Sequence, residues 1–122
     1  MARDLNSRGE IDNFVLTVVE EAKHHASGVA SVVPRLADKV LSRFDLQRDK
    51  FSVYERNGNL ARTCWVTLSG KRYAFSYNYS SKMIELKKKT LQGELIESFN
   101  NDSSDDLIDA VVARMLGEGN PP

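Results

Sequence analysis

Residues 72–79 read RYAFSYNY, and this stretch decides the fold class. Every second residue from Tyr73 to Tyr79 is aromatic, and the residues between are small or polar. Successive side chains of a β-strand point to opposite faces of the sheet, so the pattern predicts a strand with one aromatic face. Burying an aromatic ring contributes about 2 or 3 kcal/mol, so we expect this face to lie against the core.

The same alternation extends from Phe51 to Phe99 and is interrupted by short polar links. Two-residue links and short loops connect antiparallel neighbours, because a parallel crossover needs a dozen or more residues. The pattern predicts strands over residues 51–56, 60–68, 72–79, 83–88 and 94–99. The links are Asn57-Gly58, Ser69-Gly70, Ser80-Ser81 and Gln92-Gly93.

Apolar residues recur at helical spacing on both sides of this region. They predict helices over residues 10–26 and 34–44, which form an αα-hairpin, and over residues 105–116. Gly28 is expected to end the first helix in a left-handed conformation, and Pro34 suits the first turn of the second. Ser103 or Ser104 is expected to cap the third helix, and Gly117 to end it.

The sequence therefore predicts an α+β fold: an N-terminal αα-hairpin, a four- or five-stranded antiparallel β-meander and a C-terminal helix, with the helices on one face of the sheet. Residues 10–117 are expected to form a single domain between a flexible leader, residues 1–9, and a flexible tail, residues 118–122. A length of 122 residues with 41% apolar and 28% charged residues is ordinary for one globular domain.

Charge and cysteine content limit the classes of function. The net charge is zero, although residues 51–98 carry eight basic and four acidic side chains, a net charge of +4. Cys64 is the only cysteine, which excludes an internal disulfide and favours a cytoplasmic location. The longest apolar runs are far shorter than a membrane span, so we expect no membrane partner.

The outward face of the predicted sheet is the candidate binding surface. Trp65 and Tyr54 fall on the side opposite the core, and both residue types are favoured interface anchors. The surrounding interface candidates are Thr63, Thr67, Met83 and Arg72. This face predicts a non-enzymatic protein-interaction module, an adaptor or a homodimer, whose partner is itself or another protein.

Two alternatives remain open. Lys82, Lys87, Lys88 and Lys89 form the densest basic feature, and they could bind phosphates in a nucleic-acid-binding module. Glu85 and Lys87 match the E-x-K element of metal-dependent nucleases, so a small metal-dependent hydrolase or nuclease is the other alternative. No acidic residue lies between Arg56 and Met83 to complete that site.

The remaining reactive side chains predict no catalytic residue, no metal and no cofactor. His24 and His25 follow each other on a helix and point about 100° apart, so they cannot face one metal ion together. Cys64 is expected inward, where a cysteine behaves as a small apolar residue.

Overall fold

The computed structural model of this protein describes residues 2–56 and 59–117, with the side chains of residues 3–54 and 63–117. The expected Asn57-Gly58 turn and the expected tail over residues 118–122 lie outside the described residues. The elements, in chain order, are β1 (Ala2–Asp4), α1 (Arg8–His25), the 3₁₀ helix η1 (Ser27–Val29), α2 (Val32–Leu41), β2 (Lys50–Arg56), β3 (Asn59–Leu68), β4 (Lys71–Asn78), β5 (Met83–Lys88), β6 (Leu95–Phe99) and α3 (Asp105–Met115).

The described strands form one antiparallel sheet of six strands in the order of the chain, from β1 to β6. The sequence predicts four or five strands, and the count is wrong because β1 was expected to belong to a flexible leader. Arg3 pairs with Val53, and the amide of Leu5 donates to Phe51 O at 2.8 Å. A three-residue edge strand is too short for alternation to reveal it.

The backbone of two predicted links, Ser69-Gly70 and Gln92-Gly93, explains why these residue types occur there. Ser69 and Gly70 have φ angles of 50° and 83°, the positive values that a two-residue hairpin turn requires. At Gly93 a Cβ atom would lie 1.8 Å from the carbonyl oxygen of Lys88, so a side chain cannot be accommodated there. Both links therefore join neighbouring antiparallel strands as the sequence predicts.

The first helical region differs from the prediction at both ends. α1 begins at Arg8 because Ser7 caps it, with Ser7 Oγ accepting from the amide of Glu10 at 3.1 Å. The predicted left-handed Gly28 is wrong: α1 ends at His25 with Ala26 as its C-cap, and Gly28 lies within η1 without a positive φ. The chain turns toward α2 through this short 3₁₀ segment.

The other two helices are close to their predicted ranges. Pro34 lies in the first turn of α2, where its missing N–H costs nothing. Ser104 caps α3, its Oγ accepting from the amide of Leu107 at 3.1 Å, and Gly117 follows the helix with a φ of 78°. The ends of α3 are thus fixed by local side-chain and backbone chemistry.

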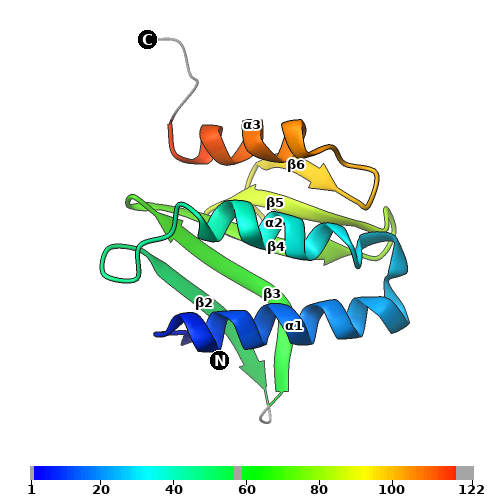
Figure 1. The fold of residues 1–122 in the computed structure, drawn as a ribbon, viewed down its shortest axis with the longest axis horizontal. Helices are drawn as coiled ribbons and strands as arrows, with labels where there is room; N and C mark the ends of the chain where they lie inside the picture. Colours follow the sequence, from blue (N-terminus) through cyan, green and yellow to red (C-terminus); the bar gives the residue numbers. More distant parts are fainter. Residues whose placement is uncertain (1, 57–58, 118–122) are drawn as a thin grey trace.

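Figure 1 shows α1, α2 and α3 lying side by side across one face of the sheet, with α2 in the middle. The helices bury an apolar core against the inward sides of the strands. Its largest fully buried side chains are Phe99, Ile11, Leu68, Leu86, Ile108 and Met115. Tyr73 is buried and Phe75 and Tyr77 pack against this core, as the alternation predicts, but Tyr79 lies beyond the end of β4 and is 66% exposed.

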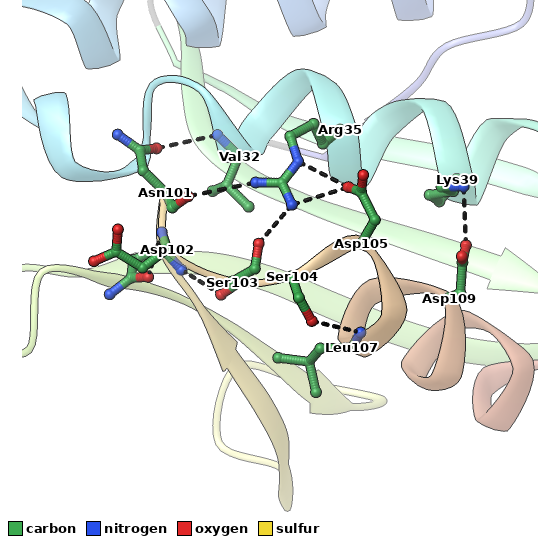
Figure 2. Close-up of polar contacts among 11 residues, drawn as sticks. Val32, Arg35, Lys39, Asn101, Asp102, Ser103, Ser104, Asp105, Leu107 and Asp109 are labelled. Carbon is green, nitrogen blue, oxygen red and sulfur yellow. Dashed lines mark hydrogen bonds and ion pairs between the residues drawn. The ribbon is translucent and has the colours of Figure 1, made fainter.

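Polar contacts tie α2 to the segment between β6 and α3 (Figure 2). The Oδ1 atom of Asn101 accepts from the amides of Ser31 and Val32 at 3.0 and 3.1 Å, which caps the start of α2 from a distant part of the chain. Arg35 donates to Asp105 at 3.0 Å and also reaches backbone carbonyls of the same segment. These contacts hold α2 and α3 at a fixed spacing over the sheet.

A buried carboxylate holds the other end of α2 in place. Asp49 is 5% exposed. Its carboxylate accepts hydrogen bonds from the backbone amides of Asp45 and Ser69, each at 2.9 Å, and from the Nε and Nη2 atoms of Arg48. These bonds join the loop after α2 to the β3–β4 turn. The hydrogen bonds from Arg48 and from the two amides lower the pKa of Asp49 to about 2, although burial acts in the opposite direction.

Candidate functional site

The face of the sheet turned away from the helices carries Trp65 near its middle. Cys64 and Val66, on either side of Trp65 in β3, face the helices, so Trp65 points the other way. The guanidinium carbon of Arg72 lies 5.4 Å from the centroid of the indole, within range of a cation–π interaction. Ala74 pairs with Trp65 and is 1% exposed, so the side chains of this face cover it.

Most of the predicted interface residues surround Trp65. Tyr54 lies two residues along β2 from Ser52, the partner of Trp65, and is 39% exposed. Thr63 and Thr67 lie two residues on either side of Trp65 and are half-buried. We call Tyr54, Thr63, Trp65, Thr67 and Arg72 the open-face cluster.

Met83 does not belong to this cluster. It lies opposite Asn78 at the start of β5, whereas Lys87 lies opposite Ala74, the partner of Trp65. Lys87 is four residue steps along β5 from Met83, a distance of about 13 Å. Met83 therefore lies on the same side of the sheet as Trp65 but away from it along β5, and its place in one binding surface with Trp65 stays a prediction.

The four lysines of the nucleic-acid alternative are divided between the two ends of β5. Lys82 precedes β5, and Lys88 and Lys89 lie at its end, about 20 Å away for six residues of strand. Lys88 pairs with Glu94 at 3.0 Å, and Lys87 pairs with Glu85 at 3.3 Å and donates to Leu91 O at 2.9 Å. The lysines thus form no single patch, and nucleic-acid binding stays a prediction.

In the described part of the chain, no acidic residue joins Glu85 and Lys87 to complete the metal site of the nuclease alternative. Glu85 forms its ion pair with Lys87 and accepts from the side-chain amide of Asn78 at 3.2 Å. Among residues 2–56 and 59–117, no three His, Cys, Asp or Glu side chains come close enough to hold a metal ion. His24 and His25 are exposed, and their ring centroids are 6.3 Å apart.

Between the helices and the sheet lies an apolar cavity of about 110 Å³ that is partly open to solvent. α1 contributes Val18 and Ala22, α2 contributes Ala37, and the sheet contributes Phe75 and Ile84. Sequence reasoning missed this feature, since it assigned all inward apolar residues to a filled core. The available signal is the small alanine side chains on the inward sides of α1 and α2.

Cys64 lines the cavity from the sheet side. Burial raises the pKa of its thiol to about 12, so the sulfur remains protonated at neutral pH. It therefore adds an apolar surface to the cavity, as expected for an inward cysteine.

No helix of the described residues is long and apolar enough to cross a membrane. No curated protein matches the sequence. The family described as "Integron cassette protein VCH_CASS1 chain" matches residues 11–108, from the first buried residue of α1 to the buried Ile108 of α3. This match spans most of the fold, and the chain belongs to the integron cassette protein VCH_CASS1 family.

Proposed function

We propose that this domain is a non-enzymatic interaction module that pairs with a second copy of itself through the open-face cluster. The observation that carries the proposal is the position of Trp65, which lies on the face opposite α1, α2 and α3 and is only half-buried. A large aromatic side chain on a sheet face gains free energy when a partner covers it. Tryptophan, tyrosine and arginine, all present in the cluster, are the residue types that most often anchor interfaces.

The charges around Trp65 favour a second copy as the partner. This face carries Asp4 and Glu85 as well as Arg72 and Lys87, by the register of β1, β4 and β5. In a two-fold interface the same surface meets itself, so a face with both signs of charge can be complementary to itself. Two sheets packed face to face would enclose the indoles in a layer about 10 Å thick.

The polar groups of this face support a binding role rather than catalysis. The Ser52 hydroxyl donates to Asp4 Oδ1 at 2.6 Å, and Lys87 is paired with Glu85. Groups with such partners keep their positions and do not have to be rearranged when another surface binds. A cytoplasmic location, favoured by the lone Cys64, is part of the same proposal.

Sedimentation equilibrium over a wide range of protein concentration tests the proposal. We expect a reversible monomer–dimer equilibrium, and Trp65→Ala should weaken dimerisation at least tenfold, as loss of a central interface anchor does. Leu16→Ala is the matched control, because Leu16 is 61% exposed on α1, on the other side of the molecule. A protein that stays monomeric at every concentration, or a dimer that both variants weaken equally, would refute the proposal.

A further inference from the structure

We propose that the cavity between α1, α2 and the sheet binds a small, uncharged apolar molecule. This inference does not depend on dimerisation, because the cavity lies on the helix-covered side of the sheet and the open-face cluster on the other. The cavity walls come from α1, α2 and strands β2 to β5, so it is enclosed by several elements of the fold. Figure 1 shows α1 and α2 crossing these strands on the same side.

The side chains around the cavity are less buried than their positions in the fold would allow. Phe75, Tyr77 and Ile84 face the helices, yet each is only half-buried. On the helix side, Val15 and Val18 are also half-buried. Apolar surface left in contact with water is unfavourable, so a molecule that fills this space recovers free energy that the protein alone does not.

Small side chains create the space. Ala22 and Ala26 at the end of α1, and Ala37 in α2, line the cavity where longer apolar side chains would fill it. The contacts of Asn101 and Arg35 hold α2 to the β6–α3 segment, which opposes a shift of α2 toward the sheet. The helix spacing and the alanines therefore keep the cavity open.

The size and the lining define the class of ligand. Apolar cavities of about 150 Å³ bind benzene or xenon, so a cavity of about 110 Å³ with one open side fits a single aromatic ring or a branched aliphatic group. The charged side chains among the lining residues are Glu21 and, when protonated, His25, both near the end of α1. Phe51, Cys64, Val66, Phe75, Ser76, Tyr77 and Ile84 line the cavity from the sheet and offer no positive charge to a carboxylate. An ion buried among apolar groups pays a large desolvation cost.

Titration with toluene and with benzoate, which share the ring and differ in charge, tests the inference. Calorimetry should show saturable one-site binding of toluene, and benzoate should bind at least tenfold more weakly. Ala37→Leu, which places three more carbon atoms in the cavity, should weaken toluene binding at least tenfold. Ala110→Leu makes the same change on the exposed side of α3 and should leave the affinity unchanged.

Methyl NMR locates the bound ring if Ala37→Leu proves unstable. In the unaltered protein, toluene should shift the methyl resonances of Val18, Val33 and Ile84, which line the cavity. The methyl resonances of Leu46 and Leu95, both exposed elsewhere, should stay in place. Absence of saturable toluene binding, equal affinity for benzoate, or shifts spread over the exposed leucines would overturn the inference.

Discussion

Replacing Asp49 by asparagine removes a negative charge that is buried among hydrogen-bond donors. The carboxylate accepts from the amides of Asp45 and Ser69 and from Arg48, and an asparagine side chain would direct its NH₂ group toward some of these donors. The pKa of Asp49 falls from 3.8 to about 2 on folding. At 1.36 kcal/mol per pKa unit, this difference corresponds to about 2 kcal/mol of stability at neutral pH.

The sign of the pH dependence follows from the lowered pKa. Between pH 2 and pH 4 the unfolded chain binds more protons at Asp49 than the folded protein does, so protonation favours unfolding. The contribution of Asp49 is therefore complete above about pH 5 and is mostly lost near pH 2. Asp49→Asn should cost about 2 kcal/mol at pH 7 and well under 1 kcal/mol near pH 2.

Urea unfolding followed by circular dichroism at both pH values measures this difference. Asp12→Asn is the control, since Asp12 forms an exposed ion pair with Arg8 and should contribute less than about 0.5 kcal/mol. If Asp49→Asn costs the same free energy at pH 7 and near pH 2, the assignment of a charge-dependent bond between the two loops is wrong.

Two polar contacts and the burial of Cys64 give three further predictions. Asn101→Ala should lower the free energy of unfolding by about 2 kcal/mol in urea denaturation, because it removes the cap of α2 and the 2.7 Å bond to Ser27 O. Tyr73→Phe should cost about 1 kcal/mol by the same assay, since its hydroxyl donates to Met115 O at 2.7 Å inside the core, and no loss would contradict that bond. The Cys64 thiol should react with iodoacetamide at pH 8 much more slowly in the folded than in the unfolded protein, because burial raises its pKa to about 12, and similar rates by mass spectrometry would contradict this raised pKa.

Local patterns were enough to predict strands β2 to β6 and the inward side of β4. The alternation from Tyr73 to Tyr77 identifies the core face of β4. Burying these three rings is more favourable than exposing them to water by several kcal/mol, so the aromatic side of the strand faces the core. Ser104 and Gly117 mark the ends of α3 because a cap and a left-handed residue act within one turn. Such features depend on neighbours in sequence.

Features that depend on register or on the distance between elements were not predictable. Met83 shares the side of Trp65 by parity, but the pairing of β4 with β5 places it at the far end of the sheet. The cavity depends on how α2 lies over the sheet, and one of the contacts that hold the start of α2 comes from Asn101, which is distant from α2 in the sequence. The edge strand β1 has only three residues, and its pairing with β2 becomes apparent only once β2 is in place.

Quenching of the fluorescence of Trp65 measures directly whether the open face binds a second copy. Trp65 is the only tryptophan of the chain, so the signal comes from this face alone. We predict that acrylamide quenches the indole efficiently in dilute protein and much less in concentrated protein, with a midpoint equal to the dimer dissociation constant from sedimentation. A quenching constant that does not change with protein concentration would contradict the central claim that this face pairs with itself.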